Sequence, residues 1–267
     1  MPGLGAEFAG VKVLTMSAGN AAVGLPKIQG VYVLFDARTL APVACLDAAE
    51  LTLLRTSATT ALAVKHILAA DPRRLGPDGE TPGPCRLVIF GTGPQAWRHI
   101  EAIAAITEIA EVVVVGRSAA KIASVVETCN ASGITARGGT VSEVGDADIV
   151  VCVTSSTTPL FEGKLVQPHA VVAAIGSHGL DAREVGPELA RRADVVVEAR
   201  ASAMRESGDL IPARSAEEWA LEQIVNLSEL VRGGLVRSRE RPALYTGVGM
   251  AWQDLAIASA IYNQRLG

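Results

Sequence analysis

The chain has 267 residues, of which 49% are hydrophobic, only 4% are aromatic and 26 are glycine. This composition is typical of an α/β protein with a core of Val, Ile, Leu and Ala, and the length allows one large or two smaller domains. The formal net charge of −4 provides no basic footprint, so nucleic acid is not an expected partner.

The start of the chain, MPGLGAEFAG, lacks the charged and apolar regions of a signal peptide. No apolar run reaches the roughly 18 residues that a membrane helix needs. The four cysteines, Cys45, Cys85, Cys129 and Cys152, follow neither a metal-binding nor a disulfide spacing. We therefore expect a soluble, cytoplasmic protein with no membrane partner and no metal site.

The first part of the chain is predicted to form consecutive strands followed by one helix. Strands are expected at 11–16, 31–35 and 42–46. Because no helix separates them, they indicate an antiparallel sheet. Asp47 and Glu50 resemble a capping box, which predicts a helix over 48–70. The following stretch, 75–84, is rich in Gly and Pro and predicts a linker.

From Arg86 onward the pattern alternates between strands and helices. Strands are expected at 87–90, 112–115, 149–153, 171–175 and 195–197. Helices are expected over 94–106 and up to about Ala131. Such alternation predicts a parallel, doubly wound sheet and hence an α/β fold of Rossmann type. Residues 201–245 predict short helices and loops, and 248–262 predicts a final amphipathic helix.

The run RLVIFGTGPQA, residues 86–96, carries the most informative motif of the chain. A short apolar run leads into G-x-G-x-x-A and opens a helix, which is the fingerprint of a dinucleotide site. Gly91 permits the tight turn, Gly93 lets backbone amides approach a pyrophosphate, and Ala96 allows close helix–strand packing. The helix N-terminus adds donors for the anion. A plain strand–helix turn is the alternative, because glycine turns are common.

The end of the next strand, Val115-Gly116-Arg117-Ser118, bears on the choice of cofactor. An NAD-specific site favours an acid here for the ribose hydroxyls, whereas a cation and a hydroxyl suit a 2′-phosphate. The sequence therefore predicts that NADP(H) is preferred, with NAD(H) possible. A surface Arg-Ser turn is the alternative.

Three side chains outside the glycine motif are candidate catalytic residues. Arg55 lies on or beside the apolar face of its helix and needs an anion, either a ligand carboxylate or a protein carboxylate such as Asp254. Lys12 lies in mid-strand, where most lysines simply face solvent. His178 follows a strand at the carboxyl end of the sheet, where ligands bind, although loop histidines are often only solvated.

Seven segments together resemble the ornithine cyclodeaminase/μ-crystallin family, in the family's order and across essentially the whole chain. They are LTLLRTSATTALA (51–63), GTGPQA (91–96), VVGRS (114–118), VTSSTTPLF (153–161), AAIGSHGLDAREV (173–185), ESGDL (206–210) and YTGVGMAWQDLA (245–256). The resemblance implies a homodimer. It also implies a smaller, discontinuous α+β substrate and dimerisation domain, 1–72 with 246–267, and a Rossmann domain over 73–245.

The resemblance also assigns roles to residues of this sequence. Lys12 and Arg55 match basic residues that hold the α-carboxylate of the substrate beside the nicotinamide. Besides Gly91, Gly93 and Ala96, the positions that match cofactor contacts are Pro94, Gln95, Arg117, Thr154, Ile175, Gly176 and Val248.

Two departures from the family pattern affect the expected activity. Members usually carry, before the equivalent of Met1, a segment with a further carboxylate-binding arginine. An incomplete site, a late start of this sequence and a genuine short form all fit that difference. Cyclodeaminases also have an aspartate where this chain has His178, and without it amine handling and cyclisation are in doubt.

These features predict an NADPH-dependent reductase of a small cyclic imino acid of the Δ1-pyrroline- or Δ1-piperideine-2-carboxylate type. Lys12, Arg55 and His178 are the expected catalytic residues. The alternatives are an ornithine cyclodeaminase or amino-acid dehydrogenase, and a non-catalytic NADP-dependent binding protein.

Overall fold

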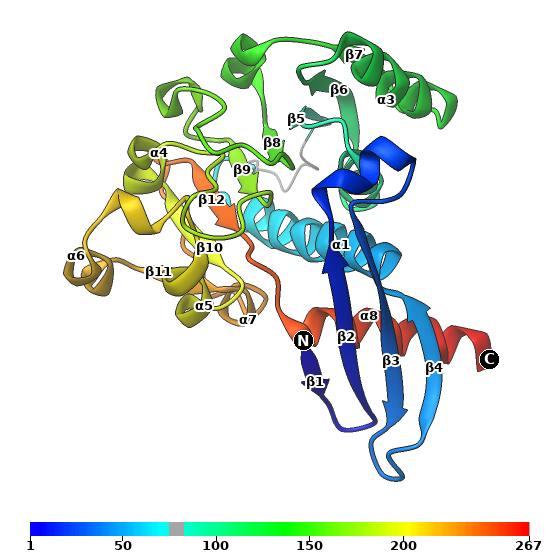
Figure 1. Cartoon of the computed structure of the whole chain (residues 1–267). Helices are drawn as coiled ribbons and strands as arrows, with labels where there is room; N and C mark the ends of the chain where they lie inside the picture. The colour runs from blue at the N-terminus through cyan, green and yellow to red at the C-terminus, as the bar shows by residue number, and fades with distance from the viewer. Residues whose placement is uncertain (75–82, 267) are drawn as a thin grey trace. The chain divides into compact units, whose positions relative to one another are not determined.

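The computed structural model describes residues 1–74 and 83–266 (Figure 1). The chain divides into two compact units. The small unit consists of Met1–Thr59 and Gly249–Gly267, and the large unit consists of Thr60–Val248. Most of the expected linker, residues 75–82, lies outside the described residues.

The division between the units falls inside helix α1 (Ala48–Ala69), whereas the expectation from the family resemblance was a boundary after residue 72. The reason is packing: Ala61, Val64 and Ile67, in the second half of α1, are buried in the core of the large unit. The second crossing falls between 248 and 249, three residues after the expected boundary at 245/246.

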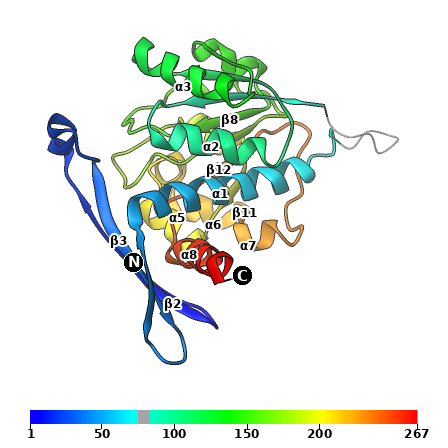
Figure 2. The same ribbon diagram turned by 90° about the vertical axis from the view of Figure 1, so that its right-hand side faces the viewer.

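The small unit is an antiparallel sheet with helix α8 packed on one face (Figure 2). Its elements are β1 (Pro2–Leu4), β2 (Phe8–Met16), η1 (Ala18–Val23), β3 (Ile28–Asp36), β4 (Pro42–Asp47), the first half of α1, and α8 (Ala251–Leu266). The strand order is β1-β2-β3-β4. The three predicted strands and the antiparallel pairing are confirmed, and β1 is an additional edge strand.

The two faces of this sheet differ in what covers them. On the inner face Tyr32 and Leu34 are fully buried and pack with Leu51 and with Leu255 of α8. Because side chains alternate along a strand, the opposite face carries Val11, Val13, Val31, Val33 and Cys45. On that face Val13 is 56% exposed and Val31 is 46% exposed. The sheet therefore has one covered and one open apolar face.

The large unit contains a parallel sheet of eight strands, ordered β11-β10-β12-β9-β8-β5-β6-β7. The strands are β5 (Cys85–Phe90), β6 (Ile109–Val115), β7 (Ala136–Gly138), β8 (Ile149–Cys152), β9 (Val171–Ala174), β10 (Asp194–Val197), β11 (Ile224–Asn226) and β12 (Ala243–Thr246). The helices are α2 (Pro94–Ala104), α3 (Ala119–Ala131), η2 (Val141–Asp146), η3 (Gly163–Leu165), α4 (Pro187–Arg192), α5 (Arg200–Glu206), η4 (Ile211–Ala213), α6 (Ala216–Leu221) and α7 (Leu227–Leu230). The predicted Rossmann-type sheet is confirmed.

Within 201–245 the expectation of helices and loops was incomplete. β12 lies inside the sheet between β9 and β10, and Ala243, Leu244 and Tyr245 are fully buried. β8 (IVVC), β9 (VVAA) and β10 (DVVV) are equally short but rich in β-branched residues, whereas β12 (ALYT) is not, so its pairing identifies it as a strand. The final helix begins at Ala251 rather than at Val248, after Gly249 with a φ of +85°.

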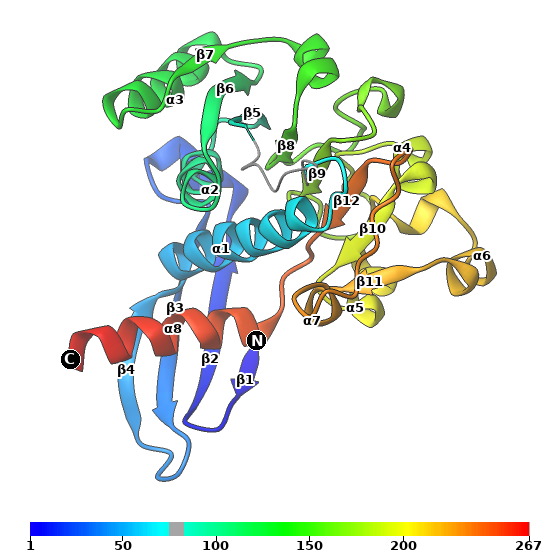
Figure 3. The same ribbon diagram turned by 180° about the vertical axis from the view of Figure 1, so that it is seen from behind.

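Both faces of the parallel sheet are covered. α2, α3 and the second half of α1 cover one face (Figure 3), and α4 and α5 contribute to the core on the other. The chain runs from β5 outward to β6 and β7, and then returns to place β8 on the other side of β5. Ligands of such sheets bind at this switch point, outside the carboxyl ends of the strands. All eight carboxyl ends lie at one edge because the strands are parallel.

Candidate functional site

The glycine motif forms a turn that only glycine can make. Gly91, directly after β5, has a φ of +124°, and a Cβ at this position would lie 2.8 Å from the carbonyl oxygen of Val153. A side chain would therefore be both strained and obstructed. The turn brings the chain into the first residue of α2.

The N-terminus of α2 fits the pyrophosphate of a dinucleotide. Its N-cap is Gly93, Pro94 occupies the first turn, and no side chain in the described part of the chain caps the helix. A Cβ on Gly93 would meet nothing within 4 Å, so the space in front of the first-turn amides is open. Ala96 is fully buried, and the buried Oε1 of Gln95 has no hydrogen-bond partner among the described residues. The residues of the motif therefore fit the group that the sequence predicted.

Arg117 and Ser118, the two residues expected to favour NADP(H), have different roles at the end of β6. Arg117, two residues after the last residue of β6, is exposed. Ser118 is the N-cap of α3, and its hydroxyl accepts a bond of 3.4 Å from the amide of Lys121. The Ser118 hydroxyl thus has a structural role in capping, whereas the guanidinium of Arg117 is accessible.

The loops after β8 and β9 are joined by one buried carboxylate, Glu184. Its Oε1 accepts hydrogen bonds from the amide of Thr154 at 2.6 Å and from the Thr154 hydroxyl at 2.7 Å. Its Oε2 accepts from the amides of Ile175 at 3.1 Å and of Gly176 at 2.6 Å. The loops also touch directly, because a Cβ on Gly176 would lie 1.9 Å from the Thr154 carbonyl oxygen. Three predicted cofactor positions therefore share one acceptor.

A second buried carboxylate holds the segment that carries Glu184. The Oδ1 of Asp209 accepts from the amides of Glu184 at 2.7 Å and of Val185 at 3.0 Å, and its Oδ2 accepts from the Ser177 hydroxyl. Burial raises the pKa of Glu184 to about 7, the hydrogen bonds from Thr154 and Gly176 oppose that rise, and the charge of Asp209 adds to it.

The remaining predicted residues of this edge lie on neighbouring loops. Val248, after β12, donates its amide to Oε2 of the buried Glu198 at 2.9 Å, and Glu198 directly follows β10. His178 is exposed in the loop after β9, two residues beyond Gly176. The sheet thus brings every predicted cofactor position to its carboxyl edge.

In the small unit, Lys12, Arg55 and Asp254 form a buried charged cluster. Lys12 Nζ donates to Asp254 Oδ1 at 2.8 Å and to the Thr52 hydroxyl at 3.3 Å. Arg55 Nε lies 3.5 Å from the same Asp254 oxygen, and Arg55 Nη1 donates to Gln253 Oε1 at 2.9 Å. Lys12 is 4% exposed, Arg55 is 7% exposed and Asp254 is fully buried. Lys12 therefore does not face solvent, and Asp254 contacts both cations.

This cluster carries an excess positive charge. Two cations face one carboxylate, and burying an uncompensated charge is costly unless an anion joins it. Burial lowers the pKa of Lys12, the hydrogen bond to Asp254 opposes that change, and the charge of Arg55 adds to it. The arrangement can bind a carboxylate and present it with an acidic ammonium.

Gly249 forms one wall of the cluster, and the sequence did not single it out. A Cβ at this position would lie 3.0 Å from both Arg55 Nη1 and Nη2. Its φ of +85° also favours glycine. The sequence also did not identify Glu184, Asp209 and Gln253 as residues of the site. A single acid or amide shows no sequence pattern that distinguishes a buried residue from one exposed to solvent.

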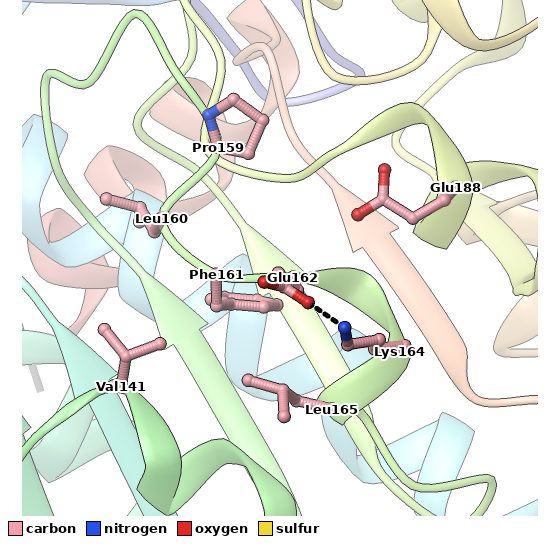
Figure 4. A pocket seen from close by; sticks show the side chains of 8 residues that line it. All are labelled: Val141, Pro159, Leu160, Phe161, Glu162, Lys164, Leu165 and Glu188. Carbon is pink, nitrogen blue, oxygen red and sulfur yellow. Dashed lines mark ion pairs between the residues drawn. The ribbon is translucent and has the colours of Figure 1, made fainter.

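A surface hollow in the large unit contains none of the predicted site residues (Figure 4). It is lined by Val141, Pro159, Leu160, Phe161, Glu162, Lys164, Leu165 and Glu188. Glu162 and Lys164 form an ion pair at its rim, and Glu188 accepts from the Gly163 amide at 2.8 Å.

Comparison with known proteins gives matches along the whole chain. The model of the ornithine cyclodeaminase/mu-crystallin family matches residues 1–267. The chain is 33% identical to Delta(1)-pyrroline-2-carboxylate reductase 2 of Burkholderia ambifaria, over 96% of this chain and 76% of that protein. It is 29% identical to the ketimine reductase mu-crystallin of Mus musculus, over 94% of this chain and 74% of that protein. A solved archaeal alanine dehydrogenase dimer with bound NAD superimposes with a TM-score of 0.85 at 25% identity, covering 100% of this chain and 80% of that one.

Proposed function

The chain belongs to the ornithine cyclodeaminase/mu-crystallin family, and from this premise we propose that it is an NAD(P)H-dependent reductase of a cyclic imino acid. The substrate class is that of Δ1-pyrroline- or Δ1-piperideine-2-carboxylate. The observation that carries the proposal is the buried cluster of Lys12, Arg55 and Asp254, whose excess positive charge matches a single carboxylate. The names of the bacterial and murine relatives support this class.

Arg55 and Lys12 orient the substrate through its carboxylate. The guanidinium can hold both carboxylate oxygens, and the ammonium adds a charge beside it. The reduced nicotinamide would supply a hydride to the carbon of the C=N bond. Because the carboxylate is attached to that carbon, fixing one end of the molecule restricts where the reacting carbon can lie.

Lys12 is also the proposed proton donor to the imine nitrogen. An iminium accepts hydride far better than a neutral imine, so the nitrogen has to be protonated before or during transfer. Lys12 donates two of its three N–H groups to described residues, and burial lowers its pKa, which makes it a stronger acid. His178 or water is the alternative source of the proton.

The preferred cofactor in this proposal is NADPH. Support comes from Arg117, which is exposed at the end of β6 where the 2′-position of the adenosine ribose would lie. The archaeal alanine dehydrogenase binds NAD, so NADH remains the competing cofactor.

The proposed assembly is a homodimer joined through the open face of the small sheet. Support comes from Val11, Val13, Val31, Val33 and Cys45, an apolar row that is partly exposed in the single chain. Such a face is characteristic of a surface that a second subunit covers.

The deciding experiment is reduction of a panel of imino acids by purified protein. We expect loss of NADPH absorbance with Δ1-pyrroline-2-carboxylate or Δ1-piperideine-2-carboxylate, and formation of proline or pipecolate. Ammonia release from ornithine would identify a cyclodeaminase instead, and NAD reduction by alanine would identify an amino-acid dehydrogenase. Tight NADPH binding with no turnover of any of these compounds would favour a binding protein.

A further inference from the structure

We propose that Glu184 is a positioning residue for the nicotinamide half of the bound dinucleotide, which it orders by fixing the loops after β8 and β9 to one another. This inference rests on the proposed function. Glu184 is not proposed to touch substrate or cofactor, and it acts through Thr154, Ile175 and Gly176.

The geometry of the carboxylate shows how it joins the two loops. Each oxygen serves one loop: Oε1 accepts two bonds from Thr154, and Oε2 accepts one bond each from Ile175 and Gly176. An ionised carboxylate has only acceptors, so all four bonds can form at once. Glu184 is fully buried, and no water shell replaces a bond that is lost.

The placement of these loops assigns them to one half of the cofactor. A Rossmann sheet consists of two mononucleotide-binding halves that meet at the switch point. The glycine motif, β6 and Arg117 belong to the half that receives the adenosine. β8 and β9 lie on the other side of β5, so the loops that follow them belong to the nicotinamide half.

Asp209 holds the backbone that carries Glu184. It accepts from the backbone amides of Glu184 and Val185 and from the hydroxyl of Ser177, which follows Gly176. Asp209 therefore anchors the backbone around Glu184 through contacts that do not involve the Glu184 side chain. A carboxylate on an anchored segment can set the spacing of two loops, which a mobile side chain could not do.

The test compares two glutamates that both accept backbone amides. In Glu184→Gln the amide nitrogen replaces one carboxylate oxygen and faces donors, so two of the four bonds are lost. The matched control is Glu188→Gln. Glu188 accepts a hydrogen bond from the amide of Gly163, which is not a predicted cofactor-binding residue. Binding to each variant is measured by calorimetry at about pH 8, with NADPH and with adenosine 2′,5′-bisphosphate, which occupies only the adenosine half.

We expect Glu184→Gln to weaken NADPH binding at least tenfold and to change binding of adenosine 2′,5′-bisphosphate less than about twofold. Glu188→Gln should leave both unchanged. If Glu184→Gln does not fold, Glu184→Asp decides: it keeps the charge, but one methylene fewer prevents its carboxylate from reaching both loops. It should show the same selective loss.

Unchanged NADPH binding by the folded variant would overturn the inference and leave the proposed function intact. A parallel loss of both ligands, with a lower melting temperature, would also overturn it, because Glu184 would then serve stability alone. Wild-type protein that binds neither NADPH nor NADH would overturn the proposed function itself, and this inference with it.

Discussion

Replacement of Arg55 by Ala separates a ligand-binding role from a purely structural one. In the structure Arg55 contacts Asp254 only at 3.5 Å, whereas Lys12 donates to the same oxygen at 2.8 Å. Removal of the guanidinium therefore leaves Asp254 paired, and the buried carboxylate is not orphaned. The stability loss should be confined to the Gln253 hydrogen bond and lost packing, about 1–2 kcal/mol.

The expected loss of catalysis is larger than the loss of stability. A buried guanidinium that binds a carboxylate contributes about 2–3 kcal/mol to transition-state stabilisation. At about 1.4 kcal/mol for each factor of ten, kcat/KM should fall by about 30- to 150-fold. Arg55→Lys should recover little of it, because an ammonium cannot reproduce the two-point contact.

The assay measures kcat/KM for the imino acid beside the melting temperature, with the exposed Arg38→Ala as a control in the same unit. Asp254→Asn should mainly lower stability, whereas Arg55→Ala should mainly lower activity. It leaves two buried cations without a counter-charge and should cost about 3–5 kcal/mol of stability. Unchanged turnover in Arg55→Ala, or a loss of activity accounted for by unfolding alone, would refute the ligand-binding role.

Four further outcomes are expected. Arg117→Asp should remove a preference for NADPH of at least tenfold, about 1.4 kcal/mol, and equal calorimetric affinities of wild-type protein for NADPH and NADH would contradict the cofactor proposal. Val13→Asp, on the open face of the small sheet, should convert the proposed dimer into monomers at micromolar concentration, as light scattering would show; a wild-type monomer would contradict the proposed assembly. Ammonia release from ornithine should be negligible, since His178 stands where cyclodeaminases carry an aspartate, and robust formation of proline from ornithine would show this inference to be wrong. The pKa of Glu184 is raised to about 7 from an ordinary value of 4.5, so the folded chain keeps this proton to a higher pH than the unfolded chain does. The free energy of unfolding should therefore fall by about 3 kcal/mol as the pH rises from 4.5 to about 7. Denaturant titrations at about pH 4 and pH 8 should show this slope in the wild type and not in Glu184→Gln.

The sequence by itself determined the class of fold and the location of the dinucleotide motif. The strands of the large sheet are mostly uninterrupted apolar runs, and the strand–turn–helix around Gly91 depends on residues close together in the chain. Local patterns of this kind are visible in a sequence because the interactions that cause them are local. The family resemblance then added roles for Lys12, Arg55 and the cofactor positions that no spacing could supply.

Only the tertiary structure decided which charges meet. Lys12 and Asp254 are separated by 242 positions in the sequence. Asp254, which the sequence offered as one possible partner of Arg55, contacts both Arg55 and Lys12. Glu184 likewise joins loops 30 and 8 positions away, and β12 enters the sheet between β9 and β10 with only four residues. Such contacts arise from strand order and burial across the whole chain, and a charged side chain has no periodicity that reveals which distant partner the fold will bring to it.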